Sequence, residues 1–426
     1  MEHKHSYKKF TLKNGLRVIF APMPATQAAT VLTLFGVGSR YETHALNGAS
    51  HYIEHMMFKG TERRPTTLDI SRELDRIGAE YNAYTGKDRT GYWITTAKKH
   101  LELALDITFD MLLHSKFDHD EVERERKVIL EEIKMYEENP LMHIEDLFEG
   151  AMYAGHELGW NIAGTKETMA GIGKKELTAF KERFYYPHNT VVIVAGSFDE
   201  TQTRQIIEKH MAGFRSGKEA VRRPRLFHPK KNPTVALHHR QVQQVQMALG
   251  FPSYGYDHKN LPALHLLNVV LGGNMSSRLF ISVRERRALA YSVHSSSEQY
   301  AETGNFKVRA GLDASRIDEA IHVILDELDA IRHGVSAKEL EDAKEYTRGK
   351  LGLALEDSAE LATWYGNQEL FLHNMRTPDE QLKRIDAVTL GQVKAVAQDI
   401  IRREKICCAI IGPWSDKGKF SKLFKI

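Results

Sequence analysis

The chain has 426 residues, of which 42% are hydrophobic and 27% charged, and its formal net charge is +3. This length predicts two or three domains, and so small a charge argues against a strong polyanion such as nucleic acid as partner. The only cysteines, Cys407 and Cys408, are neighbours that rarely bridge, which excludes a disulfide framework and favours a reducing compartment.

The charged stretch at residues 1–9 is not followed by an apolar run, and no span of about 20 apolar residues occurs in the chain. We therefore expect no signal peptide, no membrane association and a cytoplasmic location. Residues 10–12 and 17–20 are predicted strands around Asn14-Gly15, a dipeptide typical of tight hairpins, and a third strand is predicted at 29–35.

Residues 48–60 contain His51 and His55, four residues apart, with Glu54 beside the second histidine. On a helix both histidines project from one face and can hold two corners of a tetrahedral zinc site. The order His-x-x-Glu-His is the inverse of the common zincin motif, and it predicts Glu54 as general base towards metal-activated water.

A histidine pair at this spacing also arises on solvated helix faces, and this chain has 21 histidines. The neighbouring residues favour the metal site, because they make most of this helix apolar: Ile53, Met56, Met57 and Phe58. Two histidines and a carboxylate are costly to bury unless they are paired or bound to a metal. The site then needs a third protein ligand.

Further along, we predict a helix at 67–78, strands at 81–85 and 91–96, and helices at 99–114 and 119–137. The last helix has a predicted buried stripe formed by Val122, Ile129, Ile133 and Tyr136. Glu125 and Glu132 lie seven residues apart at the edge of that stripe. Glutamates on such helices are usually solvated, but these two are the candidates for the third ligand.

The second half repeats the first in outline. A strand is predicted at 189–196 and is matched by 407–412, while 306–310 matches the strand that starts at Tyr92. The two pairs of stretches are separated by nearly the same distance along the chain, and near-equal offsets indicate a duplication. The counterpart of the His51 helix falls near residues 264–268, which lack the ligands.

Each repeat mixes antiparallel-type strands with packed helices, which predicts an α+β fold of two homologous domains. We expect a catalytic zinc-binding domain at 1–215 and a C-terminal domain at 233–426 that lacks metal ligands. Residues 216–232, rich in Lys, Arg and Pro, are the expected linker, and we interpret its basic cluster at 222–225 as solvated.

Over essentially its whole length the chain resembles the M16 (pitrilysin-like) metallopeptidases, in particular the short type that includes mitochondrial processing peptidase β-subunits and bacterial relatives. The resemblance rests on His51-x-x-Glu54-His55 and on the stretch 125–132, whose last residue is Glu132. It implies a LuxS/metallohydrolase-like fold whose two domains enclose a cleft. It also implies one Zn²⁺ per chain, with Glu132 rather than Glu131 as third ligand and Glu125 orienting a ligand from behind.

Two further stretches carry the resemblance. Residues 81–85 resemble the family's active-site edge strand, which implies that Asn82 and Ala83 bind substrate as an added strand. Residues 280–291 are similar to an Arg…Tyr element, which implies that Arg284 and Tyr291 reach the substrate backbone. Where many members have Glu after the edge strand, this chain has Asp88 preceded by Lys87.

The resemblance implies a zinc-dependent endopeptidase acting on peptides or unfolded polypeptide segments, with Glu54 as base and Tyr291 or Arg284 holding the oxyanion. The alternative is a non-catalytic or partner-dependent subunit of a processing-peptidase-like complex. We favour activity, because the four metal-site positions and the Arg…Tyr pair are all present. A homodimer and a heterodimer with a related subunit both stay open.

Overall fold

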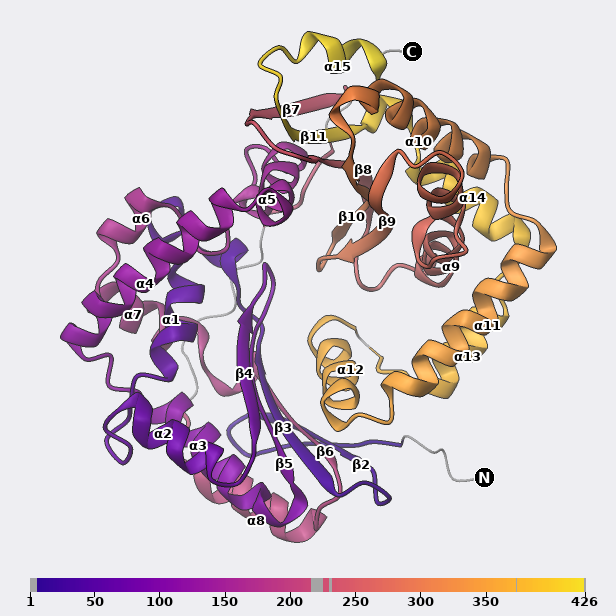
Figure 1. Cartoon of the computed structure of the whole chain (residues 1–426). Helices are drawn as coiled ribbons and strands as arrows, with labels where there is room; N and C mark the ends of the chain where they lie inside the picture. Colours follow the sequence, from indigo (N-terminus) through magenta and orange to yellow (C-terminus); the bar gives the residue numbers. More distant parts are fainter. Residues whose placement is uncertain (1–5, 216–224, 230–231, 373, 425–426) are drawn as a thin grey trace. The chain divides into compact units, whose positions relative to one another are not determined.

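The computed structural model describes residues 6–215, 225–229, 232–372 and 374–424, and the chain forms two compact units (Figure 1). Unit 1 comprises Met1–Lys134, Asn161–Pro224 and Leu351–Asp379. Unit 2 comprises Met135–Trp160, Arg225–Lys350 and Glu380–Ile426. Within the described residues, none of the helices combines the length and the apolar character that crossing a bilayer requires.

Unit 1 is built on a six-stranded sheet of order β1-β2-β6-β3-β5-β4. Its strands are β1 (Lys8–Thr11), β2 (Arg17–Pro22), β3 (Ala28–Phe35), β4 (Glu80–Thr85), β5 (Thr90–Ala97) and β6 (Thr190–Gly196). The predicted hairpin is confirmed, since β1 and β2 pair antiparallel and the turn contains Gly15 at a φ of 91°. β6 lies inside the sheet, parallel to β2 and antiparallel to β3, while β4 forms one edge.

Helices cover both faces of this sheet. Those of unit 1 are α1 (Ala49–Met57), α2 (Thr67–Asp75), α3 (Leu101–His114), most of α4 (His119–Glu138), α6 (Lys166–Gly171), α7 (Lys174–Phe184), α8 (Glu200–Met211) and α12 (Ser358–Phe371). Side chains alternate between the faces: Val18 and Phe20 of β2 join the core that contains α1 and α3, whereas Ile19 and Ala21 join the core that contains α12.

Unit 2 repeats this design with five strands in the order β7-β11-β8-β10-β9. These strands are β7 (Thr234–His239), β8 (Val245–Tyr254), β9 (Ala290–Gln299), β10 (Thr303–Leu312) and β11 (Cys407–Gly412). β11 runs parallel to β7 and antiparallel to β8, as β6 does to β2 and β3. The predicted α+β duplication is therefore confirmed.

The helices mainly in unit 2 are α5 (Pro140–Met152), α9 (Leu261–Gly272), α10 (Ile317–Arg332), α11 (Ala337–Ala354), α13 (Pro378–Asp386), α14 (Leu390–Ile400) and α15 (Gly418–Leu423).

Each half of the chain contributes one helix to the unit formed by the other half. α5, from the first half, packs against β7, β8 and β11 of unit 2, and α12, from the second half, packs against β2, β3 and β6 of unit 1. Cys407 contacts the α5 side of its sheet and Cys408 the opposite core, so these adjacent free thiols face apart. The units thus differ from the expected ranges 1–215 and 233–426 in these helices. Of the expected linker, residues 216–224 and 230–231 lie outside the described residues.

The first four helices appear where the sequence predicts them, with one difference in burial. In α4, Val122, Ile129 and Ile133 are buried, but Tyr136 is 36% exposed. Tyr136 follows Ile129 by seven residues, and the apolar stripe of a straight α-helix drifts by about 20° per heptad. A tyrosine also tolerates this drift, because its hydroxyl is well placed in water.

Candidate metal centre

The two motif histidines project from one side of α1 towards a common point. The other side of the helix packs into the core of unit 1 through Tyr52, Ile53, Met56 and Met57, all buried. The Nε2 atoms of His51 and His55 lie 3.2 Å apart. The apolar face thus anchors the helix while the polar face presents two imidazole nitrogens.

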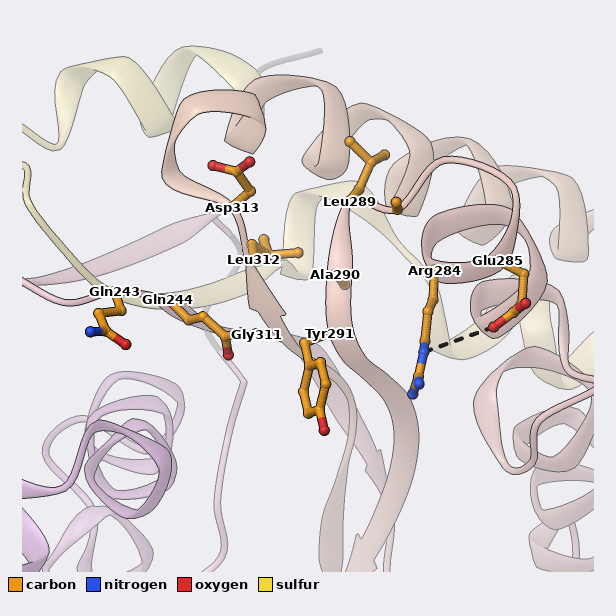
Figure 2. Close-up of a pocket in the computed structure, with 11 residues that line it drawn as sticks. Gln243, Gln244, Arg284, Glu285, Leu289, Ala290, Tyr291, Gly311, Leu312 and Asp313 are labelled. Atoms are coloured by element: carbon orange, nitrogen blue, oxygen red, sulfur yellow. Dashed lines mark ion pairs between the residues drawn. The ribbon is translucent and has the colours of Figure 1, made fainter.

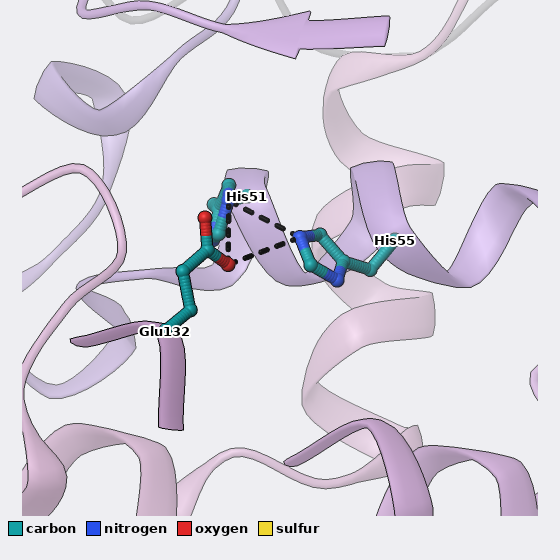
Figure 3. A group of neighbouring side chains, drawn as sticks. All are labelled: His51, His55 and Glu132. Atoms are coloured by element: carbon teal, nitrogen blue, oxygen red, sulfur yellow. Dashed lines mark hydrogen bonds and ion pairs between the residues drawn. The ribbon is translucent and has the colours of Figure 1, made fainter. Parts of the chain in front are cut away.

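Glu132 of α4 completes a cluster of three donors with these histidines (Figure 3). Its Oε2 lies 3.7 Å from His51 Nε2 and 3.5 Å from His55 Nε2. The preceding residue, Glu131, is exposed and pairs with Lys134 at 2.6 Å. The helix register therefore directs Glu132, and not Glu131, to the histidines.

The spacing of these three atoms fits a zinc ion. Ligand atoms about 2.0–2.2 Å from a tetrahedral zinc lie roughly 3.3–3.6 Å from one another, close to the observed 3.2, 3.5 and 3.7 Å. Burial, and secondly the neighbouring His55, lower the pKa of His51 to about 3. His51 is therefore neutral at physiological pH, the state in which an imidazole binds a metal.

Glu125 and Lys59 form a chain of contacts from the Nδ1 side of His55. Glu125 Oε1 lies 2.7 Å from His55 Nδ1, and Glu125 Oε2 lies 2.6 Å from Lys59 Nζ. Burial raises the pKa of Glu125, but the hydrogen bonds from His55 and Lys59 outweigh it and lower that pKa. With the proton on Nδ1, the Nε2 lone pair of His55 faces the cluster. Sequence reasoning missed Lys59, whose one signal is its position four residues after His55.

Glu54 lies outside the three-donor cluster that the described residues form, as expected of a base that is not a ligand. Its Oε2 accepts a hydrogen bond from Thr85 Oγ1, at the last residue of β4. Burial raises the pKa of Glu54, and this is the largest influence on it. Sequence reasoning did not find Thr85, since no local pattern pairs residues so far apart in the chain.

β4 is the strand predicted at residues 81–85, and it lies at an edge of the sheet, as the family resemblance implies. α1 packs beside it. Asn82 is exposed on this strand, and its Oδ1 accepts the backbone N–H of Ala83 at 2.8 Å. In the turn after β4, Asp88 is buried and forms an ion pair at 2.9 Å with the buried Arg40. Asp88 is therefore engaged inside unit 1.

Arg284 and Tyr291 lie together in unit 2. They line a hollow of about 650 Å³, with backbone from the ends of β9 and β10 and the side chains of Gln243 and Gln244 (Figure 2). The Arg284 guanidinium lies 5.5 Å from the centre of the Tyr291 ring, and its Nε lies 3.9 Å from Glu285 Oε1. Tyr291 is 72% exposed, so its hydroxyl is open to a ligand.

Comparisons with known proteins cover both halves of the chain. The family model described as Insulinase (Peptidase family M16) matches residues 17–166, and that described as Peptidase M16 inactive domain matches 171–347. The uncharacterized zinc protease YmxG of Bacillus subtilis is 35% identical, covering 95% of this chain and 98% of its own. An uncharacterized zinc protease of Streptomyces coelicolor is 37% identical, covering 96% and 90%. A crystal structure of a protease from Helicobacter pylori shares the fold, with a TM-score of 0.91 at 23% identity, and covers 96% of this chain and 100% of its own.

Proposed function

This chain belongs to the M16 peptidase family, and we propose that it is a zinc-dependent endopeptidase acting on peptides and on extended, unfolded polypeptide segments. The observation that carries the proposal is the triangle of His51 Nε2, His55 Nε2 and Glu132 Oε2, whose sides match those of a tetrahedral zinc site. The relatives named zinc proteases support zinc as the metal. The cluster of His51, His55 and Glu132 would hold one ion per chain.

When bound, zinc supplies Lewis acidity, which acidifies a water molecule and polarises a carbonyl group. His51, His55 and Glu132 would hold the ion. Glu54 takes the proton of the attacking water and passes it to the leaving amine. Its raised pKa favours holding that proton between the two steps, and the Thr85 hydroxyl fixes one of its oxygens.

We assign substrate binding to β4 and to the Arg284–Tyr291 pair. Among the described strands only β5 pairs with β4, so an extended chain can add to the other edge of β4 through backbone hydrogen bonds in the stretch of Asn82 and Ala83. There it replaces the Asn82 side chain as partner of the Ala83 N–H. The exposed Tyr291 and the Arg284 beside it are donors for a substrate carbonyl as negative charge develops on it. Pairing through the backbone selects unfolded segments, and folded domains are expected to be poor substrates.

A peptide-library assay tests the proposal. The purified chain is incubated with a mixed peptide library as isolated, after removal of metal by a chelator, and after return of one equivalent of zinc. We expect internal cleavage that stops with the chelator and resumes with zinc. Cleavage that persists without metal, or its absence in all three conditions, contradicts the proposal. Cleavage that starts only when a related chain is added supports instead a partner-dependent subunit.

We further propose a cytoplasmic location, in line with two free, buried cysteines. Cell fractionation tests the location, and light scattering of the purified chain decides between a monomer and a homodimer.

A further inference from the structure

Glu42 is a buried carboxylate close to the start of α1 that the proposed chemistry does not use. Its side chain is 2% exposed. Its Oε2 accepts the Gly48 N–H at 2.8 Å and an N–H of the Asn47 side chain at 3.0 Å, and its Oε1 accepts the Ser50 N–H at 2.7 Å. Burial raises the pKa of Glu42 to about 7, while these hydrogen bonds act in the opposite direction.

The first turn of α1 has no cap of its own. The first N–H groups of a helix lack partners within it, and Ser, Thr, Asp or Asn at the N-cap usually supplies one. Here the N-cap is Gly48, at a φ of 101°. A Cβ at Gly48 would lie 2.3 Å from Met169 Cε and 2.7 Å from the Ala163 carbonyl oxygen. Close packing thus excludes a capping side chain at this position, and Glu42 caps the turn from six residues away.

This capped turn carries part of the metal centre. Ser50, whose N–H Glu42 accepts, directly precedes His51 in a helix of nine residues. Asn47 also donates to the Asn161 carbonyl oxygen at 2.9 Å, so the same carboxylate joins the helix start to that loop. A shift of this turn moves His51 Nε2 relative to His55 and Glu132.

The segment that carries Glu42 is itself held firmly. The backbone N–H groups of Ser39 and Arg40 donate to the carbonyl oxygens of Gly86 and Lys87, and the buried Arg40 pairs with Asp88. These contacts tie the segment to the turn that follows β4. Glu42 is therefore an anchor fixed to the sheet, and α1 is attached to it.

We propose that Glu42 is a positioning residue of the metal centre, whose carboxylate holds the first turn of α1 so that His51 meets His55 and Glu132 at zinc-binding distances. This inference rests on the metal centre proposed above, and its test is zinc affinity rather than peptide cleavage. The cleavage assay therefore tests the proposed peptidase function, and zinc affinity separately tests the role of Glu42.

The test compares Glu42→Gln with Glu369→Gln. Glu369 is also buried in unit 1, but it lies on α12, against the other face of the sheet, and pairs with Lys9 and Arg17. For both variants, the zinc dissociation constant is measured by competition with a chromophoric chelator, and the melting temperature is measured on metal-free protein. We expect Glu42→Gln to weaken zinc binding by about 10- to 100-fold, because its amide cannot accept on both sides. Glu369→Gln is expected to lower the melting temperature and to leave the zinc dissociation constant within threefold of wild type.

Asn47→Ala covers the case in which Glu42→Gln fails to fold. It removes one of the three hydrogen bonds, and we expect roughly 3- to 10-fold weaker zinc binding. The inference is overturned if the folded Glu42→Gln protein binds zinc within threefold of wild type, or if Glu369→Gln loses as much affinity. If Glu42→Gln does not fold, unchanged zinc binding by Asn47→Ala overturns it.

Discussion

The metal centre of unit 1 and the corresponding place in unit 2 share a frame but differ in their donor atoms. At two nearly equal offsets along the chain, His51 of α1 recurs as His265 of α9, and Glu132 of α4 recurs as Thr347 of α11. His265 Nε2 lies 3.1 Å from Thr347 Oγ1, as His51 Nε2 lies 3.7 Å from Glu132 Oε2. The contact is kept, but a neutral hydroxyl replaces the carboxylate.

The positions of Glu54 and His55 also carry residues in unit 2 that can be neither a general base nor a metal ligand. Asn268 stands in place of Glu54, and its Oδ1 accepts from Ser295 Oγ of β9 at 2.7 Å, as Glu54 accepts from Thr85 of β4. An amide cannot serve as a base at neutral pH. Val269, buried in the core of unit 2, stands in place of His55 and offers no donor at all.

The frame around both places also repeats. Arg64 follows α1 and Arg278 follows α9 at the same offset, and each is ion-paired, to Asp110 at 2.7 Å and to Glu339 at 2.7 Å. This fold therefore does not by itself make a metal site. Three side chains on a shared frame, at the positions of Glu54, His55 and Glu132, separate the proposed metal centre from the corresponding helix pair of unit 2.

The largest expected effect comes from Glu54→Gln. This substitution replaces the proposed general base with an uncharged amide, like that of Asn268 in unit 2. We expect kcat to fall by about 10²- to 10⁴-fold with zinc retained, because a general base is lost while the ligands stay. Peptide hydrolysis and metal analysis are measured together. The double variant with Glu54→Gln and Asn268→Glu is not expected to regain activity. If Glu54→Gln alone hydrolyses peptides within tenfold of the wild-type rate, Glu54 is not the general base.

Tyr291→Phe tests whether unit 2 contributes to catalysis despite its lost donors. We expect kcat/KM to fall by roughly 10- to 1000-fold, or about 1.4–4 kcal/mol of transition-state binding. Zinc content and melting temperature should hold, since Tyr291 is largely exposed. Tyr346→Phe, which removes another tyrosine hydroxyl from unit 2, is the control and should keep full activity. If Tyr291→Phe and Tyr346→Phe have the same kcat/KM, the Tyr291 hydroxyl has no catalytic role.

Donor side chains can also be restored to unit 2. Val269→His together with Thr347→Glu places two histidines and a glutamate on the repeated frame, and we expect a second equivalent of zinc to bind. Its affinity should be at least about tenfold weaker than that of unit 1, because the buried Leu340 stands at the position that corresponds to Glu125 and cannot support the new imidazole. Zinc titration against a chelator measures both sites. A single equivalent would mean that the frames have diverged beyond their donors.

The smallest effect concerns the repeated arginines at acid pH. The hydrogen bond from Arg278 lowers the pKa of Glu339 from 4.5 to about 2, so this pair stabilises unit 2 fully above pH 4.5 and loses that contribution as the pH falls towards 2. Glu339 is partly exposed, and after allowance for screening we expect Arg278→Gln to cost about 1 kcal/mol at pH 6. Urea unfolding at pH 6 and pH 2.5 measures this. A difference from wild type that is as large at pH 2.5 as at pH 6 would contradict the assignment.

Spacing along the chain predicted much of this molecule. The hairpin at Gly15, the helix of His51 and the duplication follow from local patterns: a turn dipeptide, an apolar period and two near-equal offsets. Helix spacing alone leaves Glu125 and Glu132 as candidates for the third ligand, and the family resemblance favours Glu132. In the structure Glu132 Oε2 lies 3.7 and 3.5 Å from the two Nε2 atoms, whereas Glu125 lies at Nδ1 of His55.

Other features were not predictable from local pattern. An apolar helix face indicates burial but not which sheet provides it, so the exchange of α5 and α12 between units stayed hidden. Glu42 looks like an ordinary loop charge, because nothing near it reveals that Gly48 packs against Ala163 and lacks a cap. Lys59 and Thr85 were missed for the same reason, since their partners Glu125 and Glu54 lie far away in sequence.

The proposed zinc ligands can be seen in crystals of the zinc-loaded chain, with diffraction collected on both sides of the zinc absorption edge. We expect one anomalous peak per chain, about 2.0–2.2 Å from His51 Nε2, His55 Nε2 and a carboxylate oxygen of Glu132, and no peak beside His265. A peak ligated by Glu54 or Glu131 in place of Glu132, a peak at His265, or no peak in unit 1 would contradict this expectation.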